Sequence, residues 1–379
     1  MNFFGSVKDL FSLGSTKLLS AVINSLFWFY FASTLPKDDY GQLGFLISLG
    51  TVGHAISILG LGTVMVVHGS KDEKIIHSSY KLGIISSAIA SLGIFAISRD
   101  VFASLLVISM SVFILMTSEI NSKQKYRIYS TYTLAQKIIQ FLLAIILYPF
   151  FGFIGVIAGI SFSYLLGLRN IFKLKIYRSK LDSLKPKLQS MTNNYIIGLN
   201  QILFWWGDKL IIGSLFNFEV LGNYQIATHF LLVLYTIPSA TFVYLVPQES
   251  KGIKNKKIKI YSVLLSIVIS IISIISIPFF IDSFLPKYHE SILAMQIMSL
   301  AIIPIAISMI YESEYIGKDT SRIVLIGSTA QTGLYFLLLI VLGNVFGLIG
   351  FALGFLISSI FRSIFNFIMK RFVNFIDTK

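Results

Sequence analysis

Cysteine is absent from the 379-residue chain, which excludes a disulfide framework and any thiolate metal or redox site. Charged residues are scarce at 13%, whereas hydrophobic residues make up 55% and the mean hydropathy is +0.80. A soluble domain with so little charge could not cover its surface. The phosphate-binding pattern G-x-x-x-x-G-K-[ST] and the metal-binding pattern H-E-x-x-H are also missing, so neither P-loop nucleotide hydrolysis nor a metal site is predicted.

Apolar residues fall in runs of roughly 17–25, the length that crosses a hydrocarbon core about 30 Å thick. Helices are the expected spanning form, because the residue alternation of a transmembrane β-strand is missing. The sequence therefore predicts an all-α polytopic membrane protein of about twelve helices. The predicted spans are residues 15–34, 41–67, 82–98, 101–119, 132–150 and 153–168 in the first half, and 194–216, 222–246, 260–281, 291–311, 323–343 and 346–367 in the second.

The placement of the 31 basic residues indicates the orientation of these spans. On the side that carries both chain ends, the loops and tails hold 24 Lys and Arg, whereas the opposite side holds 3, namely Lys37, Arg99 and Lys287. Cytoplasmic loops carry such an excess. Both chain ends are therefore predicted to be cytoplasmic, and the net charge of +14 is a topology signal that does not predict nucleic-acid binding.

An internal repeat relates the two halves. Residues Arg127–Gly155 and Arg322–Gly350 align at an offset of 195 with 13 of 29 positions identical. Membrane composition alone could match Leu and Ile, but not Arg, Gln and Gly in one register. A fainter echo places Asp39–Gln42 and Leu221–Tyr224 in equivalent positions before the next helix.

Six helices in each half place both halves in the membrane in the same direction, as in a parallel-repeat transporter. We predict an N-terminal six-helix bundle over residues 1–168, a basic cytoplasmic linker over 169–192 and a C-terminal six-helix bundle over 193–379. A cleft between two such bundles would open to alternate sides when one half rocks against the other. An enzyme needs no such symmetry, so a carrier is predicted.

Three stretches resemble Wzx-type polysaccharide flippases of the multidrug/oligosaccharidyl-lipid/polysaccharide exporter (MOP) superfamily. They are FASTLPKDDYGQLGF at 31–45, WWGDKLIIGSLFNFEVLGNYQIA at 205–227, and the Phe-Gly-x-Ile-Gly pattern that ends each repeat. The resemblance covers nearly the whole chain, although Lys209 stands where the family often has Arg.

The resemblance implies a flippase that moves undecaprenyl-diphosphate-linked oligosaccharide across a bacterial inner membrane, for O-antigen, lipopolysaccharide or capsule synthesis. It implies a lipid-linked oligosaccharide and the bilayer as partners, with a polysaccharide polymerase as a further one. No cofactor is predicted, and the sequence leaves open whether H⁺ or Na⁺ as coupling ion, or the membrane potential, drives transport. A cation-coupled multidrug or metabolite antiporter of the same superfamily is the first alternative, and a membrane-embedded polysaccharide-processing enzyme is the second.

Ionisable residues inside the spans are candidate substrate-binding groups, because each costs roughly 2.5–3.5 kcal/mol at the bilayer centre. Asp208 and Lys209 lie deepest, in the seventh span. Adjacent helical residues point about 100° apart, so we expect them not to pair with each other. Trp205 would cover Lys209 by a cation–π contact, and Gln201 continues the stripe that would line the cleft. A diphosphate anchor at Lys209 and a structural ion pair between helices both remain open.

Five other residues complete the predicted site. Lys137 lies in the fifth span, where its repeat mate is Thr332, so the scaffold does not require its charge. Gln225 and His229 share a face of the eighth span and could contact sugar hydroxyls. Lys17 and Arg362 lie near span ends, where we expect their side chains to reach the head groups.

Two acidic residues close the tenth span at its predicted cytoplasmic end. We expect Glu312 and Glu314 to pair with Lys318 or Arg322.

Overall fold

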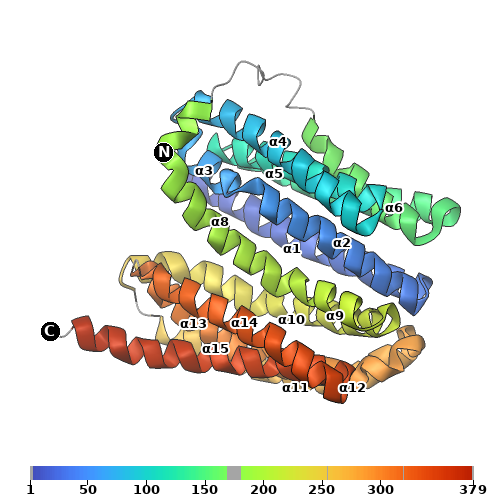
Figure 1. Cartoon of the computed structure of the whole chain (residues 1–379). Helices are drawn as coiled ribbons and strands as arrows, with labels where there is room; N and C mark the ends of the chain where they lie inside the picture. The colour runs from blue at the N-terminus through green and yellow to red at the C-terminus, as the bar shows by residue number, and fades with distance from the viewer. Residues whose placement is uncertain (1–2, 169–180, 254, 319, 378–379) are drawn as a thin grey trace. The chain divides into compact units, whose positions relative to one another are not determined.

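The computed structural model describes residues 3–168, 181–253, 255–318 and 320–377, with side chains described for Thr16 and, within these ranges, for residues 18–370. The described residues form helices and turns without any strand (Figure 1). They separate into two compact units. Unit 1 comprises Met1–Tyr30 and Gln42–Leu210, and unit 2 comprises Phe31–Gly41 and Ile211–Lys379.

The helices follow one another with short connections. Up to residue 215 they are α1 (Phe3–Thr34), α2 (Lys37–Ile58), α3 (Leu61–His68), α4 (Glu73–Ser98), α5 (Val101–Ser122), α6 (Tyr126–Ser163), η1 (Tyr164–Gly167), η3 (Leu181–Lys187), α8 (Leu188–Ile202), the π turn η4 (Leu203–Gly207) and α9 (Asp208–Leu215). Beyond it they are α10 (Phe218–Ser250), α11 (Lys256–Phe284), η5 (Pro286–Ser291), α12 (Ile292–Leu300), α13 (Ile302–Gly317), α14 (Ser321–Phe346) and α15 (Leu348–Asp377).

The predicted twelve-span polytopic fold is confirmed. Nine helices of the described residues are long and apolar enough to cross a membrane. One of them, Tyr126–Gly167, contains a kink at Gly152 and carries two of the predicted spans. The shorter apolar helix Leu18–Thr34 and the interrupted run from α8 to α9 supply the remaining two.

Two spans that were predicted as single helices are interrupted. The second, at 41–67, breaks at Leu59 and Gly60, whose φ angles are positive (49° and 72°), so α2 ends and α3 begins there. The seventh, at 194–216, contains the π turn η4 between α8 and α9. The predicted division at 1–168, 169–192 and 193–379 follows the sequence repeat, whereas units 1 and 2 follow contacts, so that division stays a prediction; residues 169–180 lie outside the described part of the chain.

The repeat has the same backbone conformation in both copies. Gly152 has φ 58° and ψ −143°, and Gly347, which lies 195 residues later, has φ 56° and ψ −130°. Three residues after each bend, a glycine lies against a carbonyl of the preceding arm, so that an added Cβ would be 2.4 Å from the Leu147 oxygen in one copy and 2.0 Å from the Leu342 oxygen in the other. Each copy is therefore a helical hairpin that turns at its Phe-Gly pair.

Alanine at either bend is expected to lower the stability of the folded chain by about 1–3 kcal/mol, since only glycine adopts this backbone region without strain. Nothing lies within 4 Å of a Cβ built at Gly152 or Gly347, so the effect would come from the backbone alone. Gly333→Ala is the matched control, because Gly333 is helical and equally open. Equal unfolding midpoints in detergent for Gly347→Ala and Gly333→Ala would contradict this explanation.

The fainter echo between the halves also has a structural counterpart, within unit 2. A Cβ added to Gly41 would meet the carbonyl oxygen of Phe218 at 1.9 Å, and one added to Gly222 would meet the carbonyl oxygen of Lys37 at 2.3 Å. Each glycine thus lies against the residue four positions before the other. The first turns of α2 and α10 therefore make a reciprocal contact within unit 2.

Packing within each unit follows the hairpins. Figure 1 shows α4 beside α5, and α14 beside α15, in agreement with their extensive contacts. In unit 1, Leu61, Tyr80 and Leu115 are fully buried in one apolar cluster. In unit 2, the buried hydroxyls of Tyr224 and Tyr335 hydrogen-bond to each other. These cores hold the polar side chains of the spans in fixed positions.

Candidate functional site

The deepest predicted charges lie where the π turn meets α9. Asp208 is 3% exposed and Lys209 is 4% exposed. The Asp208 carboxylate turns back to accept the amide N–H of Lys209 at 2.7 Å. Its Oδ1 then lies 3.3 Å from Lys209 Nζ, which makes a buried ion pair between adjacent residues.

Lys209 is held by three groups of its own segment. Besides Asp208, its Nζ donates to the carbonyl of Trp205 at 3.0 Å and lies 5.3 Å from the ring centre of Trp206. The expectation that Asp208 and Lys209 could not pair is wrong, because the carboxylate bends toward the following residue instead of extending from the helix. The expected ring contact with Trp205 is also wrong, since Trp206 supplies the ring and Trp205 supplies a carbonyl.

Lys137 belongs to a different polar network, within the α6 hairpin. Its Nζ lies 3.4 Å from Gln140 Oε1, which also accepts from Gln136 Nε2 at 3.0 Å. Gln136 in turn donates to Ser163 Oγ, across the hairpin, at 2.9 Å. Both glutamines are buried and Lys137 is half-buried. Among the described residues, no carboxylate pairs with Lys137.

The repeat mate of Lys137 supports a role beyond the scaffold. Thr332 occupies the equivalent place in α14 and donates to the Ser328 carbonyl of its own helix at 2.9 Å. A hairpin of this kind therefore folds without a charge at this position. The sequence analysis did not identify Gln140, whose repeat mate Tyr335 carries a phenol instead of an amide. The glutamine that both repeats share, Gln136 and Gln331, was the signal for a polar face on this hairpin.

The other predicted residues are distributed over both units. Gln201 is exposed on α8 and Trp205 is half-buried. In unit 2, Gln225 and His229 are buried on α10, and the ring of Tyr40 lies 6.5 Å from that of His229. The side chain of Lys17 lies outside the described side chains. The structure thus joins Asp208, Lys209 and Trp205, and it places Lys137 in a separate network.

Arg362 does not reach the head groups, contrary to expectation. It is 4% exposed, and its Nε donates to Glu312 Oε1 at 2.8 Å. Its Nη2 donates to the Val324 carbonyl at 2.8 Å, and Asn366 Nδ2 donates to the same Glu312 oxygen at 3.1 Å. A partner inside the bundle removes the reason to extend toward water.

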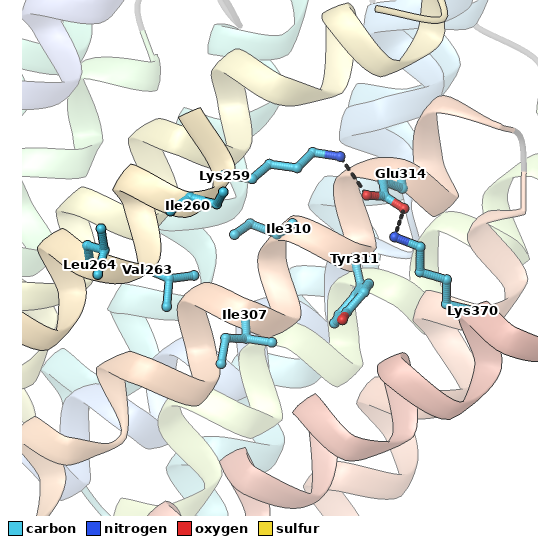
Figure 2. Close-up of a pocket in the computed structure, with 9 residues that line it drawn as sticks. All are labelled: Lys259, Ile260, Val263, Leu264, Ile307, Ile310, Tyr311, Glu314 and Lys370. Carbon is cyan, nitrogen blue, oxygen red and sulfur yellow. Dashed lines mark hydrogen bonds and ion pairs between the residues drawn. The ribbon is translucent and has the colours of Figure 1, made fainter. Parts of the chain in front are cut away.

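Glu314 is likewise paired differently from the prediction. It accepts from Lys259 at 2.5 Å and from Lys370 at 2.8 Å, as Figure 2 shows. Lys259 also lies 2.7 Å from Glu249. These pairs connect the ends of α10, α11, α13 and α15, so each of the two glutamates has basic partners that the sequence did not predict.

The pairing pattern defines what the intramembrane charges can do. Lys209 and Arg362 are each neutralised by a carboxylate, whereas Lys137 is not paired with one within the described residues. No group of three or more His, Asp or Glu among them could hold a metal ion. Of these three basic groups, Lys137 is therefore the one that could offer a cationic N–H donor to an anion without displacing a carboxylate.

Solved structures with this architecture are membrane transporters and flippases. The fold is similar to those of a lipid flippase and of transporters of the MOP superfamily. Lipid II flippase MurJ in an inward closed conformation superposes with a TM-score of 0.76 at 15% identity, over 95% of this chain and 87% of that one. An inward-facing multidrug resistance MATE family transporter gives 0.62 at 14% identity, over 93% and 94%. A MOP superfamily transporter from Pyrococcus furiosus gives 0.55 at 12% identity, over 96% and 95%.

A scan against models of protein families finds no match, and a search of curated protein sequences also finds none. At 12–15% identity the solved structures establish the fold and not the substrate. The expected two-bundle helical fold is confirmed, and its solved neighbours are transporters and a flippase.

Proposed function

We propose that this chain is a flippase that moves undecaprenyl-diphosphate-linked oligosaccharide from the cytoplasmic to the outer leaflet of a bacterial inner membrane. Alternating access between its two halves would carry the glycan across, for O-antigen, capsule or exopolysaccharide synthesis. A polysaccharide polymerase would use the product, and H⁺ or Na⁺ would be the coupling ion.

One observation carries this proposal. Lys137 is a cation inside a span, and among the described side chains its ammonium group hydrogen-bonds to the neutral Gln140, at 3.4 Å, and to no carboxylate. An ionisable residue at such depth is a functional group by default, because its insertion is unfavourable. A lipid-linked diphosphate would supply the missing negative charge and would accept hydrogen bonds from Lys137.

Lys209 is the second proposed phosphate ligand. In the structure, Asp208 and the Trp205 carbonyl satisfy its ammonium group. A diphosphate would replace the Asp208 carboxylate as the partner of the Lys209 ammonium group. After release of the substrate, Asp208 would pair with Lys209 again and hold it in position. The exposed Gln201 on α8 would contact the glycan.

The alternative of a cation-coupled drug or metabolite antiporter draws support from the MATE transporters of the same fold. A coupling site of that kind needs a carboxylate free to bind an ion or proton. Asp208 and Glu312 are each engaged by a base within 3.3 Å. The pairing therefore favours a site for anions.

Complementation of a flippase-deficient bacterium tests the proposal. The chain would be expressed with a matching glycan pathway, and surface polysaccharide would be measured. We expect it to be restored, to be lost with Lys209→Ala, and to be largely retained with Lys251→Ala at an exposed loop. Failure with every glycan, together with proton- or sodium-driven export of small cations, would favour the antiporter instead.

A further inference from the structure

An apolar groove lies between α11, α13 and α15, within unit 2 (Figure 2). Its volume is about 430 Å³, which is within the range of ligand sites in proteins. Its apolar walls are formed by Ile260, Val263, Leu264, Ile307 and Ile310. Ile260 and Leu264 remain exposed on α11, a helix apolar enough to face lipid.

All the polar lining residues lie at one end of this groove. Lys259, Tyr311, Glu314 and Lys370 gather there, at the predicted cytoplasmic ends of the three helices. Lys370 is 37% exposed and lies 5.1 Å from the centre of the Tyr311 ring. The groove is thus amphipathic along its length, with an ionic end and an apolar interior.

The charges around the ionic end are unbalanced. Glu249 and Glu314 face Lys259 and Lys370, so these four side chains are neutral together. Three more lysines lie exposed at the adjoining end of α10 and start of α11: Lys251, Lys256 and Lys257. The surplus of positive charge matches an anionic head group, and basic pockets between helices on the cytoplasmic side bind such lipids.

The dimensions fit the upper part of an acyl chain. From Lys259 to Leu264 the α11 wall extends by roughly 8 Å at 1.5 Å per residue. A soluble anion would gain nothing from the isoleucine walls, whereas a phospholipid places a phosphate and an apolar chain at this separation.

We propose that this groove binds an anionic phospholipid, with its phosphate near Lys370, Lys256 and Lys257 and one acyl chain between Val263 and Ile307. The bound lipid would stabilise the cytoplasmic ends of α11, α13 and α15. This inference is independent of the transported substrate, because the groove residues are not among those proposed to contact it.

Native mass spectrometry of the full chain in detergent tests the site without any transport measurement. We expect phosphatidylglycerol to bind more tightly than phosphatidylcholine with the same acyl chains, by about fivefold for each lysine engaged. Lys256→Gln combined with Lys257→Gln should remove most of this preference and leave phosphatidylcholine binding unchanged. Soluble glycerol phosphate should not compete, since it lacks the chain.

Filling the groove provides the matched control pair. Val263→Phe should abolish the preference for phosphatidylglycerol, whereas Val268→Phe, on the same helix but outside the groove and 49% exposed, should retain it. Both variants should elute as the wild-type chain does on size exclusion. Equal binding of the two phospholipids, equal loss in both phenylalanine variants, or tighter binding of undecaprenyl phosphate than of phosphatidylglycerol would overturn the proposal.

Discussion

Replacing Lys137 with alanine is expected to reduce transport of the lipid-linked substrate at least about 30-fold. Loss of one partner of a desolvated, hydrogen-bonded charge pair costs about 2 kcal/mol or more, which corresponds to that factor. Lys137→Arg should retain a measurable fraction, because the charge and N–H donors remain while their geometry changes. The measurement is flipping of a fluorescent lipid-linked oligosaccharide in proteoliposomes, with surface glycan in cells as a second readout.

Stability separates this role from a structural one. The Lys137 ammonium group hydrogen-bonds to Gln140 at 3.4 Å and to no carboxylate among the described residues, and the repeat mate of Lys137 is an uncharged threonine. Lys137→Ala should therefore leave the unfolding midpoint unchanged or raise it, because the unfavourable insertion of a charge is removed. A fall in midpoint together with the fall in transport would mean that Lys137 holds the hairpin.

A lysine on the same helix supplies the control. Lys125 precedes α6 and is exposed, so Lys125→Ala should keep both transport and stability. Full transport by Lys137→Ala would remove the central support for a diphosphate site, and the antiporter would then become the leading function.

The fold could be predicted from sequence because its signals are local or periodic. Long apolar runs predict spans without any knowledge of their partners. The Phe-Gly pair occurs in both repeats. Gly152 and Gly347 have nearly the same φ and ψ angles, so the sequence identity at this pair corresponds to the same backbone conformation. Neither the apolar runs nor the bend at the Phe-Gly pair depends on which helices pack together.

The details of the site could not be predicted in the same way. The π turn η4 changes the helical geometry just before Asp208, and the residue types of Leu203–Gly207 do not predict a π turn. Arg362 and Glu312 are separated by 50 residues, so a pattern within one span could not pair them. An arginine near the end of a span can either extend to the lipid head groups or pair with a buried acid, and the sequence position is the same in both cases. Tertiary contacts decide between them.

The Arg362–Glu312 pair is expected to be the largest single contribution to the stability of unit 2 among its ion pairs. Removal of one partner from a buried pair is destabilising by about 3–5 kcal/mol, because the remaining charge is left uncompensated. Arg362→Leu would leave the Glu312 carboxylate without its cation and the Val324 carbonyl without its guanidinium donor, while Asn366 would still donate to Glu312. The expected result is a large fall in unfolding midpoint and in yield of folded protein.

The double variant distinguishes a charge effect from a packing effect. Glu312→Leu combined with Arg362→Leu removes both charges, and buried pairs replaced by apolar residues often lose little or no stability. We therefore expect the double variant to be more stable than either single one. Arg322→Leu is the control, since Arg322 is exposed and its loss should change the midpoint little.

A change at Gly327 tests the same pair without altering either charge. A Cβ added there would lie 2.3 Å from Arg362 Nη1 and 2.5 Å from the Phe365 ring, so Gly327→Ala must displace the guanidinium. Its destabilisation should be smaller in the Arg362→Leu, Glu312→Leu background, where the guanidinium is gone and only the Phe365 ring still lies close to the added Cβ. If Gly327→Ala lowered the midpoint equally in both backgrounds, the contact with Phe365 would account for the whole effect. The substitution would then not act through the Arg362–Glu312 ion pair.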